Sequence, residues 1–455
     1  MATRRNAAGS DAALEASVAG LGARRVAQSA VADLIGKNRA FALEDALAQA
    51  GRGACLDPAD AALARAIATV TFRRLGFLKR ALAGRMKQGL PENQPRLLAL
   101  LATGAAQILD LNVPDHAAVD LSVRLAKADP PLQHLGPLVN AVLRRVIRER
   151  DAILAEAIDP LENNTPAWLA ARWRAAYGEE TARAIARAHL RGAAVDLTVR
   201  AEPDLWAERL DAIRLPLGSL RLRDARVGIS DLPGYEDGAW WVQDAAAAIP
   251  ARLLAPAAGA RVADLCAAPG GKTAQLAAVG AVVTAVDRSA TRLVRLRQNL
   301  ARLGLTADIV TGDALEVPEG TFDAVLLDAP CSATGTIRRH PDVAWTKAEA
   351  DIGRLAALQA RLLDRAATLV RPGGCLVYCT CSLEPEEGEH QIAAFLGRHD
   401  AYERVPVRPA ETGGLTELID PNGDLRTLPA HLDGAAHEVR GGLDGFFASR
   451  LRRRS

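Results

Sequence analysis

The stretch RVADLCAAPGGKTAQLAAVGAVVTAVD, Arg261 to Asp287, decides the fold of the second half of the chain. It contains an apolar run that ends at Leu265, a glycine-containing turn, a helical pattern and a second apolar run. The same alternation of short apolar runs and helical patterns begins near Trp241 and continues to the C-terminal region. This pattern predicts an α/β domain over residues 241–455, built on a mostly parallel, doubly wound sheet.

The first part of the chain has a different pattern. Over residues 19–150, apolar residues recur at three- and four-residue spacing, and prolines fall between the periodic runs. This spacing predicts an all-α domain, with helices over 26–35, 60–78, 94–111, 116–128 and 135–147. Residues 1–18 are expected to form a flexible tail. Residues 151–240 mix a helical run with the short strand pattern DLTVRA, and we expect a small α+β connector there.

Composition excludes several classes of protein. The 455 residues are 49% apolar and 24% charged, which is ordinary for globular domains and excludes disorder throughout. The sequence contains neither a long apolar run nor the apolar stretch of a signal peptide, so we expect a cytoplasmic protein without a membrane segment. Six cysteines in a reducing compartment do not form a disulfide framework.

Charge is distributed unevenly along the chain. Residues 1–150 carry 21 Lys and Arg against 13 Asp and Glu, a net charge of +8, whereas the whole chain carries +2. Basic clusters recur at helical spacing in Arg73 to Lys87 and Leu143 to Arg150. Such clusters suit phosphate binding, although a solvated helix face is the alternative for any one of them.

In a doubly wound sheet, ligands bind beyond the carboxyl ends of the strands. The turn after the first strand is formed by Cys266, Ala267, Ala268, Pro269, Gly270, Gly271 and Lys272. Its backbone can approach a ligand closely, and its N–H groups at a helix start favour polar groups. A P-loop is excluded because that motif requires glycine where Cys266 stands. Asp287 ends the second strand and Asp313 follows the third, and together these acids indicate an adenosine-bearing cofactor.

Five motifs carry a family resemblance, namely DLCAAPGGKT, DAPCSATG, RRHPD, YCTCS and DGFFAS. Together they resemble the RNA cytosine-5 methyltransferases, and most closely the bacterial members that act on small-subunit (16S) ribosomal RNA. Those members carry a helical N-terminal domain similar to the antitermination factor NusB, and the resemblance covers the chain from about residue 20. It implies a Rossmann-like class I methyltransferase domain over 241–455 and a NusB-like RNA-binding domain over 19–150.

The resemblance also implies site residues. S-adenosylmethionine would be held by Cys266 to Lys272, Asp287, Asp313 and Asp328, and Cys381 would be the nucleophile. Carbon 5 of cytosine is too poor a nucleophile to attack a methyl sulfonium, so a thiolate must first add to carbon 6. Asp328 is the candidate for stabilising that adduct near the ring nitrogen. Cys331 matches the family's release residue, although the cysteine of a Pro-Cys motif is the nucleophile in DNA cytosine methyltransferases.

Strand geometry separates the neighbouring cysteines. On one strand Cys375, Cys379 and Cys381 face the same side, and Cys381 alone reaches the carboxyl edge. The family usually has a small apolar residue at the position of Cys379, so we expect this thiol to be packed. No cysteine and histidine spacing suits a metal, and we expect none.

Arg338, Arg339 and His340 follow Cys331 within ten residues and are candidates to contact the RNA backbone. DGFFAS is expected to be the last strand of the sheet. Two alternatives to a ribosomal RNA enzyme remain, namely the same chemistry on transfer RNA or another RNA, and an inactive NusB-like RNA-binding protein. We expect a monomer.

Overall fold

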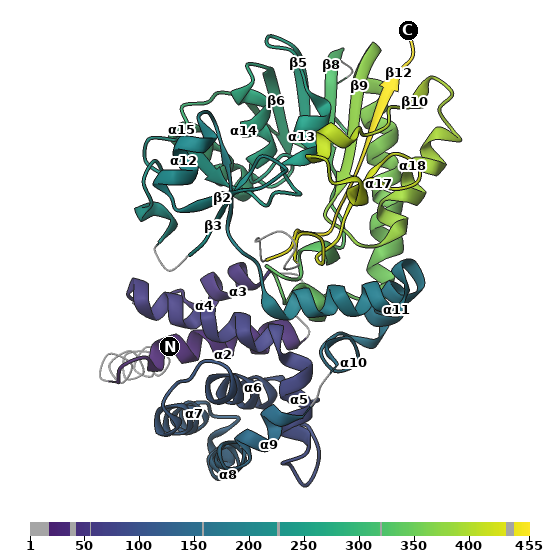
Figure 1. Cartoon of the computed structure of the whole chain (residues 1–455). Coiled ribbons are helices and arrows are strands. Elements are labelled where there is room, and N and C mark those ends of the chain that lie inside the picture. The colour runs from purple at the N-terminus through teal and green to yellow at the C-terminus, as the bar shows by residue number, and fades with distance from the viewer. Residues whose placement is uncertain are drawn as a thin grey trace, which may run out of the picture. The chain divides into compact units, whose positions relative to one another are not determined.

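The computed structural model describes residues 18–36, 42–54, 56–156, 159–224, 228–318, 321–433 and 441–455. The expected tail before Val18 lies outside the described residues. The chain forms two compact units (Figure 1). The helical unit contains the residues up to Ala171 together with His340–Lys347, and the sheet unit contains Arg172–Arg339 and Ala348–Ser455.

The helical unit confirms the predicted all-α fold. Among the described residues from 18 to 166, every regular element is a helix. The α-helices are α2 (Leu21–Ile35), α3 (Leu43–Ala50), α4 (Pro58–Arg73), α5 (Leu75–Ala83), α6 (Pro95–Leu109), α7 (Asp115–Ala128), α8 (Gly136–Arg148), α9 (Arg150–Ala155) and α10 (Pro160–Asn163). Helix α11 (Ala167–Arg191) starts in this unit and ends in the sheet unit.

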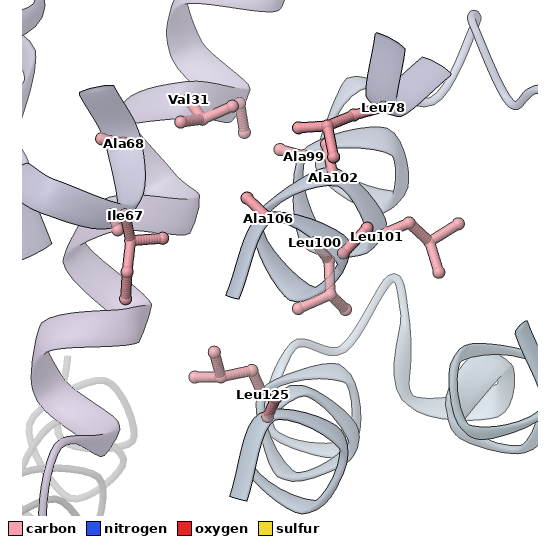
Figure 2. Packing of buried hydrophobic residues seen from close by; sticks show 14 of the residues in the cluster. Val31, Ile67, Ala68, Leu78, Ala99, Leu100, Leu101, Ala102, Ala106 and Leu125 are labelled. Carbon is pink, nitrogen blue, oxygen red and sulfur yellow. The ribbon is translucent and has the colours of Figure 1, made fainter. Parts of the chain in front are cut away.

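Helix α6 forms the centre of the helical core. Its sequence PRLLALLATGAAQIL is apolar around the whole helix, and nearly all of its residues are buried. A helix that is apolar all round must be covered on every side. Figure 2 shows its Leu100, Leu101 and Ala106 among residues of the neighbouring helices, including Ile67 and Leu125.

The predicted helix over 60–78 is two helices, and this prediction was wrong. Helix α4 ends at Arg73 and α5 starts at Leu75. The break accompanies a close approach at Gly76, where a Cβ atom would lie 2.2 Å from the carbonyl oxygen of Asn163. Phe77 N–H also donates to Asn164 Oδ1 at 3.2 Å. A tertiary contact thus interrupts a sequence pattern that is helical throughout.

The segment His340–Lys347 packs within the helical unit, although it is far from that unit in sequence. Asp342 Oδ2 accepts a hydrogen bond from Leu43 N–H at 3.1 Å, at the start of α3. Trp345 Nε1 donates to the Phe72 carbonyl at 3.0 Å. The short helix α16 (Val343–Thr346) lies in this segment.

The sheet unit contains the predicted doubly wound sheet (Figure 1). In its described residues, the strand order is β10-β12-β9-β8-β5-β6-β7, and β11 pairs with β12. Strands β7, β6, β5, β8 and β9 are parallel to one another, whereas β12 is antiparallel to β9, β10 and β11. The bounds are β5 (Arg261–Leu265), β6 (Val282–Asp287), β7 (Asp308–Thr311), β8 (Phe322–Asp328), β9 (Val370–Thr380), β10 (Tyr402–Arg404), β11 (Leu425–Thr427) and β12 (Phe446–Arg453).

Helices cover both faces of this sheet. Alternate residues such as Leu326 and Val377 pack with α13 (Ile249–Leu254) and α14 (Gly271–Ala278). Their neighbours Leu327 and Tyr378 pack instead with α17 (Glu349–Leu369) and α18 (Glu389–Leu396), while α15 (Ala290–Arg302) covers β6. Chain order moves outward from β5 through β6 and β7 and then returns to β8 on the other side. The switch point therefore lies between β5 and β8, where ligands are expected.

The region predicted as an α+β connector contains a small antiparallel sheet in the order β2-β3-β1-β4. Its strands are β1 (Asp196–Val199), β2 (Ala212–Arg214), β3 (Leu220–Leu222) and β4 (Trp240–Val242), with helix α12 (Pro203–Arg209) after β1. The pattern DLTVRA is therefore a strand, as predicted. DGFFAS also enters a strand, and β12 inserts between β9 and β10.

Candidate active site

The predicted site residues follow strands whose ends lie at one edge of the sheet. Leu265 at the end of β5 pairs in register with Val286 and Leu327, and Asp328 pairs with Cys379. The residues that follow these strands therefore start from neighbouring positions.

The turn Cys266–Lys272 has a backbone that only particular residues adopt. Gly270 has φ 102°, and a Cβ atom there would lie 2.7 Å from Leu296 Cγ, so glycine is required. Cys266 also has a positive φ of 61°. Burial and the acids Asp328 and Asp287 raise the pKa of Cys266 to about 12, which keeps it a neutral thiol. Helix α14 begins directly after Gly270.

Asp287 ties this turn to the next strand. Its carboxylate accepts from Ala268 N–H at 3.1 Å and from Ser289 N–H at 2.8 Å, and the residue is buried. The backbone of β7 pairs alongside, with Thr311 in register with Asp287. Asp313, two residues beyond β7, is exposed and accepts from Leu315 N–H at 2.9 Å.

Asp328 lies between the cofactor turn and the cysteines. Its Oδ2 accepts from Lys272 Nζ at 2.8 Å, and its Oδ1 lies 3.5 Å from Cys379 Sγ. Burial opposes the charge on Lys272, but Asp328 and the neighbouring thiols outweigh it and raise the pKa of the ammonium group. Lys272 is thus a buried cation, with Nζ 4.9 Å from the centroid of the Phe446 ring.

The two predicted catalytic thiols lie together. Cys331 Sγ and Cys381 Sγ are 3.4 Å apart, and both residues are partly exposed. Two backbone hydrogen bonds join the loops around them, from Ala329 N–H to the Cys379 carbonyl at 2.9 Å and from Gly335 N–H to the Cys381 carbonyl at 3.0 Å. The hydrogen bond with Cys381 and burial raise the pKa of Cys331.

Cys379 differs from this pair. It is fully buried, and burial, followed by the charge of Asp328, raises its pKa well above the ordinary value. This agrees with the expectation of a packed thiol, since Cys379 lies in the apolar cluster with Val377 and Ala448.

The three residues predicted to contact RNA have different surroundings. Arg338 is fully buried and pairs with Asp244 and Asp444, while Arg339 is exposed and also pairs with Asp444. His340 is exposed and belongs to the helical unit. The buried guanidinium of Arg338 has no surface to offer to RNA, so we correct that prediction and assign Arg338 to holding its own loop in place. The sequence alone did not indicate the burial of Arg338, because an arginine in a polar loop is usually exposed to solvent.

Two buried acids near the site were missed. Asp264, inside β5, accepts from Thr273 Oγ1 at 2.6 Å, and burial raises its pKa to about 7. Glu387 accepts hydrogen bonds from both cysteine loops. A single sequence carries little signal for either, because Asp264 interrupts an apolar strand and Glu387 lies in the acidic run EPEE.

Neither a metal centre nor a membrane span is present in the described part of the chain. No three His, Cys, Asp or Glu side chains group there as metal ligands would. Nor is any helix there long and apolar enough to cross a membrane.

Comparison with known proteins identifies relatives for both units. Residues 251–452 match the family model "16S rRNA methyltransferase RsmB/F", and residues 21–148 match the NusB family. Ribosomal RNA small subunit methyltransferase B of Cronobacter sakazakii is 36% identical over 416 residues, which are 86% of this chain and 90% of that protein. The protein of that name from Vibrio cholerae is 37% identical over 373 residues, 78% of this chain and 86% of that protein.

A solved structure has the same fold. The crystal structure of PH0851 aligns with 96% of this chain and 99% of its own, with a TM-score of 0.71 and 24% sequence identity. The sequence identity to the two methyltransferase relatives, and the share of the chain that it covers, establish the family as well as the fold. The chain belongs to the RsmB/F family of 16S ribosomal RNA methyltransferases, and is an S-adenosylmethionine-dependent RNA methyltransferase with a NusB domain.

Proposed function

We propose that this chain methylates carbon 5 of a cytosine in small-subunit ribosomal RNA through a covalent adduct with Cys381. The observation that carries the proposal is the pair of thiols, 3.4 Å apart and partly exposed, just beyond the paired strand residues Asp328 and Cys379. A covalent route needs a thiolate that adds to carbon 6 and a base that removes the proton from carbon 5, and two neighbouring thiols can fill these two roles. The names of the relatives support the choice of RNA.

The cofactor fits the turn. We assign S-adenosylmethionine, which supplies the methyl group, to Cys266–Lys272, Asp287, Asp313 and Asp328. Gly270 lets the backbone approach a ligand closely. In the exposed Asp313, Leu315 N–H donates to Oδ1, which leaves Oδ2 outside this turn bond. Asp287 already accepts two backbone N–H groups, so it positions the turn and uses its remaining lone pairs for a ribose.

The chain's own residues then perform the following steps. Cys381 adds as thiolate to carbon 6 of the cytosine, which gives carbon 5 enamine character. Asp328 stabilises the adduct near the ring nitrogen, and Lys272 holds the Asp328 carboxylate in place. After methylation, Cys331 gives up its own proton to solvent and, as a thiolate, accepts the proton from carbon 5, and the Cys381 thiolate is expelled.

We assign RNA binding to the exposed Lys and Arg side chains of the helical unit. Several cations of the two basic clusters form internal pairs, such as Arg85 with Glu149 and Arg150 with Asp115. Arg80 also pairs, with Glu156, whereas Lys87, Arg144 and Arg148 are exposed. These side chains can neutralise phosphates, with the salt dependence this entails. Arg339 of the sheet unit and His340 of the helical unit are also exposed, and both stay candidates for RNA contact.

The proposal is tested with RNA from a strain that lacks the gene. Purified protein and S-adenosylmethionine are incubated with 16S ribosomal RNA or with transfer RNA from that strain, and 5-methylcytosine is mapped by bisulfite sequencing. We expect one new modified cytosine in the 16S RNA. Modification of transfer RNA alone would favour the same chemistry on the other substrate, and modification of neither, with naked RNA or 30S particles, would favour an inactive RNA-binding protein.

A further inference from the structure

A buried carboxylate, Glu387, lies between the two cysteine loops. The residue has no exposed surface. Its Oε1 accepts from Ser332 N–H at 2.9 Å, and its Oε2 accepts from the Ser332 hydroxyl and, at 2.6 Å, from the Ser382 hydroxyl. Ser332 follows Cys331 directly and Ser382 follows Cys381 directly, so one carboxylate joins the residues next to both thiols.

Helix α17 and strand β9 complete the network. Gln359 Nε2 donates to Glu387 Oε1 at 3.0 Å and also to the Pro330 carbonyl at 2.9 Å. The hydroxyl groups of Tyr378 and Thr380 both donate to the Glu387 backbone carbonyl, at 2.8 and 3.0 Å. The position of the carboxylate is therefore determined by a helix and a strand of the scaffold.

The energetics favour a rigid arrangement. A carboxylate removed from water is costly unless several donors satisfy it, and hydrogen bonds to a buried charge are stronger than neutral ones. Both cysteines lie beyond the ends of their strands, where the regular pairing of the sheet no longer holds the chain. Beyond the strands, the backbone bond from Gly335 N–H to the Cys381 carbonyl and the hydrogen bonds to the common acceptor Glu387 hold the two loops.

We propose that Glu387 is a positioning residue, whose carboxylate holds the Cys331 and Cys381 loops so that both thiols reach one cytosine. The inference rests on the proposed function only for the use of the two thiols. The juxtaposition itself is testable without RNA.

Charge offers a second way for Glu387 to act, because its negative charge also contributes to raising the pKa of Cys331. Glu387→Gln separates the two roles. Glutamine keeps an acceptor oxygen for Ser332 N–H and Gln359, and its amide can donate to the two serine hydroxyl oxygens, but the charge is lost. Positioning is thus retained in Glu387→Gln and lost in Glu387→Ala.

The first measurement is oxidative crosslinking with diamide. The two thiols lose two protons and two electrons and form one sulfur–sulfur bond, and the azo group of diamide is reduced to a hydrazine. The sulfur atoms need to approach by only about 1.4 Å to reach a disulfide distance. Peptide mass spectrometry follows the Cys331–Cys381 bond, and Cys331→Ala is the control that cannot form it.

We expect Glu387→Ala to slow this crosslink by about tenfold or more, and Glu387→Gln to stay within about threefold of wild type. The matched control is Glu386→Ala, because the neighbouring Glu386 is partly exposed and pairs with Arg172, outside the network. It should crosslink at the wild-type rate. A wild-type rate in Glu387→Ala would overturn the proposal, as would equal losses in Glu387→Ala and Glu387→Gln.

Steady-state kinetics provide the second measurement. Loss of position should lower kcat by about a hundredfold with KM for RNA little changed, because a displacement near 1 Å costs about that much in an oriented reaction. Glu387→Gln should recover most of kcat. A Glu387→Ala effect confined to KM would instead assign the residue to substrate binding and overturn the proposal.

S-adenosylmethionine binding, measured by calorimetry, shows whether each variant has folded. If Glu387→Ala does not fold, the double variant Ser332→Ala/Ser382→Ala removes the two hydroxyl donors and should slow crosslinking severalfold; an unchanged rate there overturns the proposal. If crosslinking behaves as expected while wild-type protein methylates no RNA, the positioning role stands and the proposed function fails.

Discussion

The two halves of the candidate site are held in place by different kinds of contact. In the cofactor half, Asp287 accepts backbone N–H groups from Ala268 and Ser289, which belong to short turns near in sequence. In the cysteine half, Glu387 joins side chains from loops 50 residues apart and from helix α17. The cofactor half is thus shaped by backbone geometry, and the cysteine half by a buried side-chain network.

This difference predicts how substitutions act. Removing one acceptor from the cofactor half should weaken binding by a graded amount, because the turn keeps its other hydrogen bonds. Removing a thiol from the cysteine half should stop one chemical step entirely, because no neighbouring group can form the same bond.

The largest effect is expected for Cys381→Ala. Without this thiolate, methyl transfer should fall by about 10⁴-fold or more, and no protein–RNA adduct should appear on a denaturing gel. Cys331→Ala should instead accumulate a gel-shifted adduct, because addition and methylation proceed while release stalls. An adduct present in Cys381→Ala and absent in Cys331→Ala would exchange the two roles. An adduct in neither variant would contradict the release role of Cys331, and adducts in both would contradict the covalent mechanism.

A stability effect is expected for Asp264→Asn in the cofactor half. Burial raises the pKa of Asp264 from 3.8 to about 7, so between these values the folded protein holds a proton that the unfolded chain has lost. Its contribution to stability is therefore present at low pH and lost as pH rises from about 4 to about 7. Because asparagine does not titrate, the variant should gain up to about 4 kcal/mol relative to wild type over that range.

Thermal unfolding of the cofactor-free protein between pH 4 and pH 8 measures this difference. The exposed acid Asp308 on β7 provides the control, because Asp308→Asn makes the same chemical change at a solvent-exposed position. A constant difference between Asp264→Asn and wild type would mean that Asp264 keeps an ordinary pKa.

Asp287→Ala should weaken S-adenosylmethionine binding by about 1.5 to 3 kcal/mol, through lost ribose hydrogen bonds and a loosened turn. Titration calorimetry gives the affinity. The matched control is Asp308→Ala, which also removes an acid, but at the start of β7, opposite the strand ends where Asp287 lies. Unchanged affinity would remove Asp287 from the cofactor site. A large loss of crosslinking between Cys331 and Cys381 in Asp287→Ala would show that the two halves are coupled.

The basic surface of the helical unit should control RNA affinity without affecting the chemistry. Arg144→Ala/Arg148→Ala removes two exposed cations of α8. The slope of log affinity for RNA against log salt concentration should become shallower by about 1 for each phosphate contact that is lost. The control is Arg354→Ala/Arg361→Ala, which removes the same charge from exposed positions of α17. Filter binding at several salt concentrations measures both, and equal losses of affinity would mean that overall charge alone matters.

The smallest effect is expected for Cys379→Ala. Alanine suits a position fully buried beside Ala448, and the thiol contacts Asp328 only at 3.5 Å. Activity should stay within about threefold, with a stability loss of about 1 kcal/mol for the small cavity. Total loss of methyl transfer would mean that the nucleophile is Cys379 and that the two-residue spacing along β9 was misassigned.

Much of the fold followed from local pattern. Periodicity predicted most of the long helices and the doubly wound sheet, because burial of one helix face or strand face leaves a regular trace. It failed between α4 and α5, where a contact with Asn163 interrupts a continuous helical pattern. It also gave no sign that His340–Lys347 packs with the helices, because that packing depends on Leu43 and Phe72.

The sequence by itself predicted the turn that we assign to the cofactor, the acids at the strand ends and our proposed choice of Cys381 over Cys379 as nucleophile. Each of these depends on neighbours in sequence, through glycine conformation or the two-residue period of a strand. Only the tertiary structure decided that Arg338 is buried between Asp244 and Asp444, that Lys272 pairs with Asp328, and that Glu387 joins the cysteine loops. A buried polar side chain is tolerated when distant partners satisfy it, and the identity of those partners is set by the fold and not by sequence spacing.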